Sequence, residues 1–409
     1  MGFSVSTHAG KRFMIRNKIG LIPRYNWDYG LSELSRSLLR LSSTEGECSE
    51  IFRKIFGSEP IFTNAGRTSL YAILKSLDLP QGAEVGVPLY CCPVVFDAIK
   101  QAGLTPRFVD VNLEDYCLSP ADLKDKISSL KAIVLVHMFG HPADMEPILA
   151  TCDGIPVIED CAQSLFSKYK GTYTGFLSGY SFFSFRSGKY ISAGEGSALF
   201  LRDPSRIESV KSIANSFEQR GFLGDVVHSA ATYIKSTFYK RPWYGTIGSP
   251  LGKRMDRKLN LTAKAGFTPG RIGKSDLAVI GHRIGSFLSK VVKQRENAEY
   301  LLKNIGGGNL ILPSERPECW SNYSQFAIRL GSEQKRDRLA AYLFDHGVDS
   351  AKYGDEVLDV VKQDYHYSGD CPNSEQASKT ILVIPNYYTL SQKDLDRVAD
   401  CVNSGSKLL

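Results

Sequence analysis

A carboxylate and a lysine occur in two short segments that together could hold a reactive cofactor. In the first segment, a run of apolar residues ends at Asp160 and is followed by Ala162 and Gln163. In the second, aromatic residues lead through Ser184 into a loop that ends at Lys189. A lysine amine forms a Schiff base with an aldehyde, and a carboxylate keeps a ring nitrogen protonated so that the ring withdraws electrons. Pyridoxal phosphate requires both groups.

Each of these two residues also has an ordinary structural explanation. Asp160 taken alone could cap a helix, and Lys189 taken alone could be a surface lysine. The cofactor hypothesis therefore depends on the combination and not on either residue.

The segment from Asn64 to Ser69 is suited to binding a phosphate. Small residues around Gly66 precede a predicted helix that Asn64 could cap, and exposed backbone N–H groups together with the helix dipole favour an anion there. Arg67 could add a charge-assisted hydrogen bond to that anion. Alternatively, Arg67 is a solvent-facing arginine in the first helical turn.

The elements that must position these segments alternate between helical patterns and short β-branched runs, from about residue 51 to residue 200. This alternation is typical of a doubly wound α/β sheet. Strands are predicted at 84–88, 105–111, 132–136 and 156–158, with a helix at 94–101. In such sheets the ligand lies beyond the carboxyl ends of the strands, which is where Asp160 stands.

The second half of the chain is organised differently. The pattern from 217 to 269 has no clear period and is rich in aromatic and basic residues, whereas 275–302 reads as one long helix. Strands at 323–330 and 381–385 and helices at 336–346 and 394–402 predict a small α+β domain. We therefore divide the chain into an N-terminal segment (1–50), a cofactor-binding domain (51–216), an insert (217–269), and a linking helix with the small domain (270–409).

Length and composition exclude several other classes of protein. The 409 residues exceed what one compact core usually holds. The apolar runs are too short to cross a membrane, and no signal peptide is apparent, so a cytoplasmic location is expected. The nine cysteines lack zinc spacing, so neither a metal nor disulfides are expected. The net charge of +7 has no basic block that would indicate nucleic acid, and it fits an anionic small molecule or a solvated basic surface equally well.

Three motifs resemble those of one enzyme family. They are IEDCAQ at 158–163, FSFRSGK at 183–189 and GEGS at 194–197. They are similar to the motifs of the DegT/DnrJ/EryC1/StrS sugar aminotransferases, and the segments 108–111, 136–145 and 369–375 extend the resemblance over most of residues 55 to 409. The resemblance implies an aspartate aminotransferase-like fold, with a mostly parallel seven-stranded sheet in a large domain and a small C-terminal α+β domain.

The resemblance also assigns roles to single residues around pyridoxal 5'-phosphate. It makes Lys189 the lysine that carries the cofactor and Asp160 the partner of the ring nitrogen. Gln163 would bind the side of the ring that carries the hydroxyl, and Ala162 would lie against a ring face. The phosphate would be held by Ser184 and by the helix start with Gly66, Arg67 and Thr68.

The chain departs from the family pattern at two positions. The family often has an aromatic residue that stacks on the cofactor ring where this chain has Cys92, and Tyr90 lies two residues earlier. Arg271 aligns with an asparagine that reaches the phosphate of the neighbouring subunit in relatives. An arginine could do the same, or the alignment could be shifted.

The implied reaction moves an amino group, usually from L-glutamate, onto a keto-sugar that is usually nucleotide-linked, in the biosynthesis of amino sugars, polysaccharides or natural products. The implied working unit is a homodimer. The alternatives are a pyridoxamine-phosphate-dependent sugar dehydratase, which has histidine in place of Lys189, and a non-catalytic regulatory protein that binds the cofactor. We further hypothesise that the insert covers the active-site mouth and contacts an anionic substrate through Lys240 and Arg241; oligomer packing is the alternative.

Overall fold

The strands predicted for the first half of the chain form the centre of a seven-stranded sheet. The computed structural model describes residues 18–39, 45–251, 267–307 and 310–409. Within them the strand order is β1-β9-β8-β5-β4-β2-β3. In that order the strands are β1 (Ile61–Thr63), β9 (Ser197–Leu201), β8 (Tyr180–Ser184), β5 (Val157–Asp160), β4 (Leu130–Val136), β2 (Glu84–Pro88) and β3 (Thr105–Val109). Among these strands β9 alone runs opposite to the other six, which confirms the predicted mostly parallel sheet.

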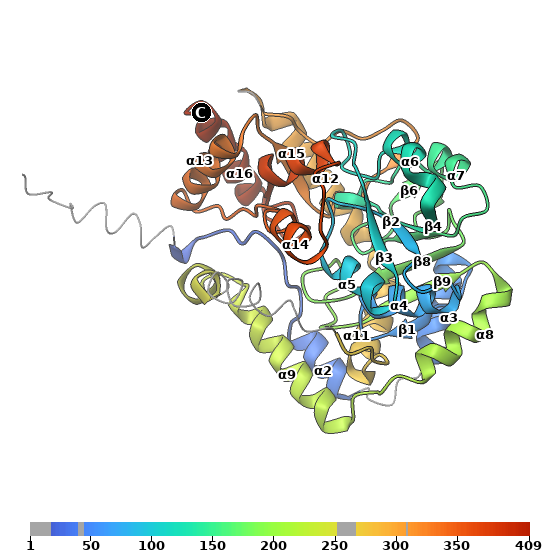
Figure 1. The fold of residues 1–409 in the computed structure, drawn as a ribbon. Coiled ribbons are helices and arrows are strands. Elements are labelled where there is room, and N and C mark those ends of the chain that lie inside the picture. The colour runs from blue at the N-terminus through green and yellow to red at the C-terminus, as the bar shows by residue number, and fades with distance from the viewer. Residues whose placement is uncertain (1–17, 40–44, 252–266, 308–309) are drawn as a thin grey trace, which may run out of the picture.

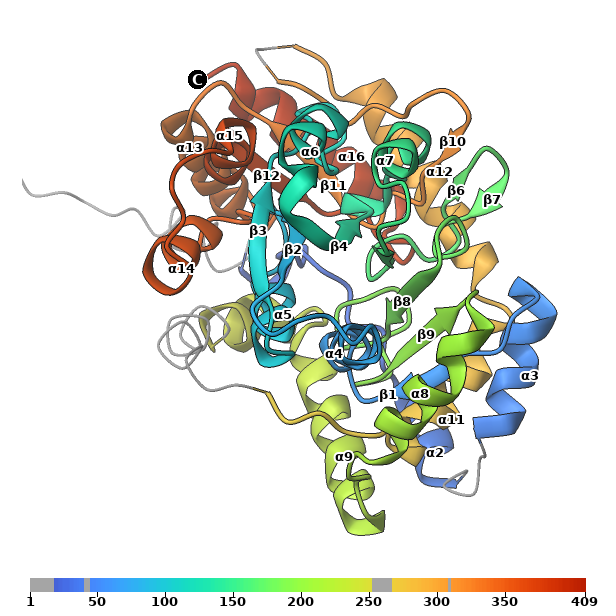
Figure 2. The ribbon, with the colours of Figure 1, turned by 45° about the vertical axis from the view of Figure 1, so that its right-hand side comes forward.

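Helices lie on both faces of the sheet (Figures 1 and 2). Neighbouring side chains of one strand therefore pack against different helices. Phe182 of β8 packs in one buried cluster with Leu70 of α4 (Gly66–Ser76), whereas Phe183 packs in another with Phe52 of α3 (Glu45–Phe56). This alternation follows from the period of two in a β-strand. The other helices around the sheet are α5 (Val94–Gln101), α6 (Pro120–Lys126), α7 (Met145–Thr151) and α8 (Pro204–Asn215).

The small domain has a core of its own, as predicted. Its strands β11 (Phe326–Arg329) and β12 (Ile381–Ile384) pair antiparallel. The helices of this domain are α13 (Glu333–Asp345), α14 (Val357–Asp364), α15 (Pro372–Thr380) and α16 (Gln392–Ser406). Phe326, Leu343 and Val398 meet in a buried cluster between the sheet and the helices. A separate three-stranded sheet joins β10 (Cys319–Trp320) to β6 (Lys168–Tyr169) and β7 (Thr172–Tyr173).

The link between the domains is two helices, so the prediction of one long helix is wrong. They are α11 (Lys274–Ile284) and α12 (Leu288–Asn304). Gly285, which is a poor helix former, follows the last residue of α11. Among the described helices, none is long and apolar enough to cross a membrane.

The insert contains regular structure that the sequence pattern did not predict. It forms the α-helix α9 (Phe222–Phe238) and the short π-helix η3 (Tyr244–Gly248), while residues 252–266 lie outside the described part of the chain. Helix α9 contacts α2 (Leu31–Leu39) and α11. Its period was missed because the residues on its buried side are polar, among them Asp225 and Ser229.

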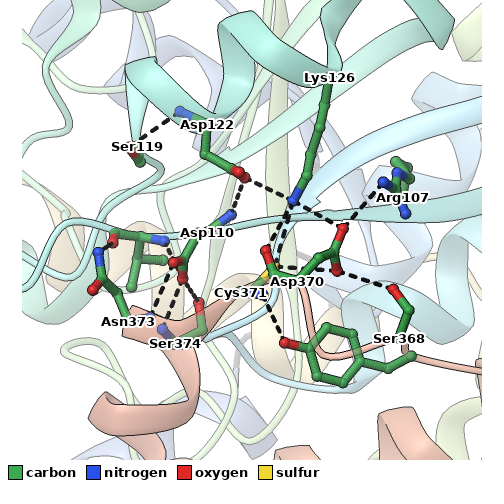
Figure 3. A network of polar contacts seen from close by, with 12 residues as sticks. Arg107, Asp110, Ser119, Asp122, Lys126, Ser368, Asp370, Cys371, Asn373 and Ser374 are labelled. Carbon is green, nitrogen blue, oxygen red and sulfur yellow. Dashed lines mark hydrogen bonds and ion pairs between the residues drawn. The ribbon is translucent and has the colours of Figure 1, made fainter.

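Two segments with family-like motifs, far apart in sequence, meet where the domains join (Figure 3). Asp110, directly after β3, accepts hydrogen bonds from the backbone N–H groups of Asn373 at 3.0 Å and Ser374 at 2.7 Å, and from the Ser374 hydroxyl at 2.7 Å. Lys126 of α6 bridges Asp122 of the large domain and Asp370 of the small domain. Asp110 therefore caps the start of α15 and ties the small domain to the sheet.

Candidate functional site

Asp160 lies at the carboxyl end of β5, near the middle of the sheet. Its side chain is only 6% exposed, and its Oδ1 accepts a hydrogen bond from the N–H of Ala162 at 2.9 Å. Burial raises the pKa of Asp160, while the Ala162 N–H and the positive charge of Lys189 oppose that rise. A cationic ring nitrogen would favour the charged form of this carboxylate in the same way.

Lys189 reaches the same region from the loop after β8. Its backbone N–H donates to the carbonyl of Arg186 at 3.0 Å, which closes a turn. Gly188 in that turn has a φ of +88°, and a Cβ there would lie 3.0 Å from the indole nitrogen of Trp27. Burial lowers the pKa of Lys189, and Asp160 partly offsets this effect. A lowered pKa makes the lysine amine a better nucleophile at neutral pH.

The predicted phosphate turn lies beside the end of β8. Helix α4 begins at Gly66, and no side chain caps the first N–H groups of this helix. A Cβ on Gly66 would lie 3.1 Å from the ring of Phe182 and 3.6 Å from the Cβ of Ser184. The turn is therefore pressed against the residue predicted to donate to the phosphate, and its free N–H groups suit an anion.

Some side chains around this turn make other contacts than those predicted from the sequence. Asn64 does not cap α4, because its Oδ1 accepts hydrogen bonds from the Thr68 hydroxyl at 2.6 Å and from the N–H of Gly270 at 3.2 Å. The Thr68 hydroxyl is thus directed at Asn64. Arg67 is an exposed residue whose guanidinium is partly covered, because it lies over the ring of Phe267, 4.9 Å from the ring centroid. Burial and the nearby charge of Arg186 lower the pKa of Arg67, which places two cations close to the turn.

Gln163 makes a contact that the sequence did not reveal. Its Oε1 accepts a hydrogen bond from the N–H of Phe139 at 3.1 Å, and its Nε2 donates to the hydroxyl of Tyr353 at 3.0 Å. Tyr353 belongs to the small domain, and its carbonyl accepts a hydrogen bond from the Tyr90 hydroxyl at 3.0 Å. Tyr90 is fully buried against Tyr353, so it is committed to this contact between domains. Cys92 is exposed and lies close enough to Lys189 to interact with its charge.

A pocket opens over Lys189 between the two domains. Ala162 and Gln163 line it from the large domain, together with Lys189. It is also lined from the N-terminal segment by Arg24, Tyr25 and Asn26, and from the small domain and α12 by Gln294, Ser324, Gln325 and Val383. The part played by residues 24–26 was missed because nothing in their types or spacing indicates a site.

The insert supports this N-terminal segment from outside the pocket. Tyr239 stacks on Trp27 with ring centroids 4.0 Å apart, and the Ser236 hydroxyl is 2.6 Å from the carbonyl oxygens of both Trp27 and Tyr29. Arg241 forms a bidentate pair with Asp394 of α16, at 2.7 Å and 2.8 Å. No insert residue in the described range 217–251 is among those that line the pocket.

Arg271 is engaged within its own chain. Its guanidinium donates to Glu45 of α3 at 3.0 Å, and its backbone N–H donates to the carbonyl of Glu218. The neighbouring Gly270 carbonyl accepts from the N–H of Asn64 at 2.9 Å. The loop that carries Arg271 therefore lies against the phosphate turn of the same chain.

A buried pair behind the site holds the strand ends in place. Nε2 of His137 lies 3.0 Å from Oε2 of Glu159, and Nδ1 of His137 accepts from the N–H of Ala143. This leaves the proton on Nε2, where it is donated to Glu159. Glu159 also accepts backbone hydrogen bonds from Gly175, Leu177 and Ser178. These contacts hold in place the end of β5, which carries Asp160.

The site therefore offers an amine, a buried carboxylate and an open helix start at one edge of the sheet. This donor set fits pyridoxal phosphate, which presents an aldehyde, a basic ring nitrogen and a dianionic phosphate. The sequence predicted these three groups, because each lies in a short contiguous motif.

The sequence is similar to those of known aminotransferases. The sequence profile of the DegT/DnrJ/EryC1/StrS aminotransferase family matches residues 49–403. GDP-perosamine synthase of Escherichia coli O157:H7 is 28% identical over 344 residues, which is 83% of each chain. Erythromycin biosynthesis sensory transduction protein EryC1 of Saccharopolyspora erythraea is 30% identical over 361 residues, which is 85% of each chain.

The fold is shared with solved aminotransferases. The aminotransferase TlmJ from Streptoalloteichus hindustanus superposes with a TM-score of 0.76 at 22% identity, over 95% of this chain and 99% of that one. The putative sugar aminotransferase Spr1654 from Streptococcus pneumoniae, solved in a PLP form, superposes with a TM-score of 0.74 at 16% identity. The predicted fold is confirmed by these structures, and the predicted cofactor by the family match. Since the family profile spans nearly the whole sequence, this chain belongs to the DegT/DnrJ/EryC1/StrS aminotransferase family and is a pyridoxal-phosphate-dependent aminotransferase.

Proposed function

We propose that this enzyme transfers an amino group to a keto-sugar that is linked to a nucleotide. The observation that supports it best is the position of Lys189 opposite Asp160, beside an open phosphate turn. The names of several relatives point to the same substrate class. Among them are UDP-N-acetyl-3-dehydro-alpha-D-glucosamine 3-aminotransferase of Acidithiobacillus ferrooxidans, 25% identical, and dTDP-3-amino-3,4,6-trideoxy-alpha-D-glucose transaminase of Streptomyces venezuelae, also 25% identical.

The residues around Lys189 would bind the cofactor, and Lys189 itself would also transfer a proton. Bound pyridoxal phosphate withdraws electrons from the carbon that must lose its proton. Lys189 would hold the cofactor covalently, and its amine would move the proton as general base and then general acid. Asp160 would keep the ring nitrogen protonated, Gln163 and Ala162 would hold the ring, and the start of α4 with Ser184 would hold the phosphate.

Lysine at position 189 also bears on the alternative reaction. The related dehydratases have a histidine there and cannot hold the cofactor through an amine. In this chain a partly buried lysine with a lowered pKa interacts with the Asp160 carboxylate. We therefore propose amino transfer in preference to dehydration.

The amino donor we propose is L-glutamate, and the proposed place of action is the cytoplasm. None of the nine cysteines is paired in a disulfide in the structure, and free thiols are compatible with a reducing compartment. The pathways that fit are those that build amino sugars for polysaccharides or natural products.

We also propose a homodimer in which each chain completes the phosphate site of the other. Arg271 is the residue that would reach across, and its loop lies against the phosphate turn of its own chain in the single chain that the structure describes. To do so, Arg271 would have to leave its pair with Glu45.

Two measurements test this function. Adding L-glutamate to the purified enzyme should replace the absorbance of lysine-bound cofactor with that of the amine form, and a panel of nucleotide-linked keto-sugars should restore it. Lys189→Ala should fold, lack that absorbance and lose turnover, whereas Lys211→Ala, which removes an exposed lysine, should change neither. Normal transamination by the Lys189 variant would disprove the proposal.

A further inference from the structure

Side-chain oxygens without a partner gather on one wall of the pocket over Lys189. Ser324, Gln325 and Asn386 line the pocket from the small domain. The Oγ of Ser324, the Oε1 of Gln325 and the Oδ1 of Asn386 are buried and have no hydrogen-bond partner among the described residues. Buried polar atoms are almost always paired. Three unpaired oxygens around a single pocket therefore indicate that a ligand supplies the missing partners.

The orientation of the Asn386 amide is fixed by the backbone. Its Nδ2 donates to the carbonyl of Tyr323 at 3.1 Å. A carbonyl only accepts, so the nitrogen must face Tyr323 and the oxygen must be the atom that is left without a partner. Asn386 is only 4% exposed. Its oxygen therefore requires an O–H or N–H group of a ligand.

Gln294 of α12 also lines the pocket and is oriented in the same way. Its Nε2 donates to the carbonyls of Tyr323 at 2.8 Å and Ser324 at 3.2 Å, which uses both of its protons. Only the Oε1 of Gln294 remains to meet a ligand, and this oxygen only accepts. We call Gln294, Ser324, Gln325 and Asn386 the polar wall.

The polar wall is uncharged and suits hydroxyl groups better than anions. Its amide oxygens accept, and carboxylate or phosphate oxygens also only accept, so an anion cannot satisfy them. The charged residues that line the pocket are Arg24 and Lys189, and no lining residue in the described chain is acidic. An anionic group of a ligand is favoured beside those cations. A hydroxyl group donates as well as accepts, so it can complete the wall.

Neither the cofactor nor a neighbouring chain accounts for the polar wall. The residues that would hold the cofactor all belong to the large domain. The three unpaired oxygens are covered within a single chain, so they do not depend on a second subunit to bury them. Ser324 and Gln325 are only partly buried, and their side chains can turn toward a ligand without a change in the backbone. The substrate is therefore the ligand that fits.

We propose that the polar wall recognises hydroxyl groups of the sugar acceptor and selects a sugar that keeps a hydroxyl next to its carbonyl group. This inference rests on the proposed function and names the chemistry of the acceptor. Lys189, where the carbonyl must react, lines the same pocket as the wall. The hydroxyl groups nearest the carbonyl are thus those that the wall would meet.

The second half-reaction with matched acceptors tests this inference. One acceptor is the keto-sugar of the panel that the wild type accepts, and the other is the same sugar with hydrogen in place of the hydroxyl next to the carbonyl. The wild type should return the absorbance of lysine-bound cofactor roughly tenfold to a hundredfold faster with the hydroxylated sugar at equal low concentration, because the analogue leaves buried acceptors unpaired.

The double substitution Ser324→Ala, Gln325→Met removes two of the unpaired oxygens. It should lower the preference for the hydroxylated sugar at least about fivefold, and it should slow the sugar half-reaction more than the half-reaction with L-glutamate. The midpoint of thermal unfolding should be unchanged or higher, because the removed oxygens make no hydrogen bond among the described residues. A lower midpoint would mean that these side chains stabilise the fold, and it would overturn the assignment.

Asn297 of α12 provides a matched control for Asn386. Its Nδ2 also donates to a backbone carbonyl, that of Tyr387 at 3.0 Å, and its Oδ1 also has no partner among the described residues, but Asn297 does not line the pocket. Asn386→Leu should reduce the preference for the hydroxylated sugar, whereas Asn297→Leu should retain it. Equal rates of the wild type with the two sugars, or equal effects of the two asparagine substitutions, would overturn this inference and leave amino transfer to keto-sugars intact. A wild type that accepts no keto-sugar would instead refute the proposed function, and this inference with it.

Discussion

The side-chain amide of Gln163 donates a hydrogen bond to the hydroxyl of Tyr353, with 3.0 Å between the two atoms. Gln163 lies directly after β5 of the large domain, and Tyr353 belongs to the small domain. The orientation of a residue in the pocket is therefore set from the other domain. Tyr353 is a positioning residue, because it acts on the site through Gln163.

Replacing Tyr353 with phenylalanine should disturb the cofactor more than the fold. Loss of one neutral hydrogen bond costs about 1 kcal/mol of stability. Without this acceptor, the Gln163 amide keeps its contact with the Phe139 N–H but loses the bond that orients its Nε2, so the absorbance maximum of the bound cofactor and its pH titration should both shift. Tyr116→Phe removes a hydroxyl from the same aromatic cluster without touching Gln163 and should leave that spectrum unchanged. An unaltered titration in Tyr353→Phe would mean that the contact is only structural.

Burial of Lys189 should be visible in the pH dependence of cofactor capture. Burial lowers the pKa of Lys189, and Asp160 partly offsets this. Since only the neutral amine attacks the aldehyde, the rate at which apo-protein captures pyridoxal phosphate should rise with pH and level off above that lowered pKa. The midpoint should lie below that of an exposed lysine. In Asp160→Asn it should fall further, because the negative neighbour that favours the charged amine is removed; a midpoint at or above the ordinary lysine value would contradict this account.

Asp160→Asn should separate cofactor binding from turnover. The variant keeps the shape of Asp160 and retains Lys189 and the phosphate turn, so it should still bind pyridoxal phosphate. It cannot hold the ring nitrogen protonated, and turnover should fall on the order of a hundredfold or more. Steady-state kinetics with saturating cofactor measures this loss. Activity close to that of the wild type would mean that another anion supports the ring.

The parts of the site that the sequence predicted are those encoded in short local motifs. Asp160, Ser184 and Lys189 each lie at a strand end or in the loop that follows it, so their positions follow from the sheet. Tyr353 could not be predicted, because its contact with Gln163 spans 190 positions and depends on how the domains pack. The pocket residues 24–26 were missed for the same reason.

Helix α9 was not predicted for a different reason. Sequence periodicity identifies helices by assuming that the apolar side is buried. In α9 the buried side carries Asp225 and Ser229, which bond to neighbouring elements or lie against them, and the apolar side is exposed. The end of α11 was not predicted, because apolar residues continue at helical spacing past Gly285 and suggest one long helix.

Asp110 should be important for joining the small domain to the sheet. It is 5% exposed and accepts three hydrogen bonds at the start of α15. Hydrogen bonds to a charged group are worth roughly 1.5–3 kcal/mol each but are not additive, so we expect Asp110→Ala to cost about 3 kcal/mol in chemical denaturation. Asp370→Ala removes a more exposed partner of Lys126 and Arg107 and should cost less than about 1 kcal/mol. Equal effects of the two substitutions would show that the cap on α15 has no special role.

Mixing of variant subunits tests whether Arg271 completes the site of a neighbouring chain. In a single chain Arg271 pairs with Glu45, a partly exposed contact whose loss through Glu45→Ala should cost less than about 1 kcal/mol and leave turnover unchanged. Arg271→Ala should weaken retention of the cofactor if it also serves a phosphate. In a mixed dimer of Lys189→Ala and Arg271→Ala, one composite site then carries both defects and the other carries neither. Random pairing should restore up to about a quarter of wild-type activity per total site.

The opposite outcome is that mixing the two variants restores no activity. Suppose that Arg271→Ala has reduced turnover on its own and that verified subunit exchange with Lys189→Ala restores no activity. Arg271 then belongs to the same active site as the Lys189 of its own chain. The loop geometry permits this outcome, because the Gly270 carbonyl accepts from the N–H of Asn64, next to the phosphate turn of the same chain. Recovery near a quarter would instead require Arg271 to exchange Glu45 for a phosphate across the interface, which is favoured because phosphate offers a guanidinium a bidentate partner of higher charge than a carboxylate.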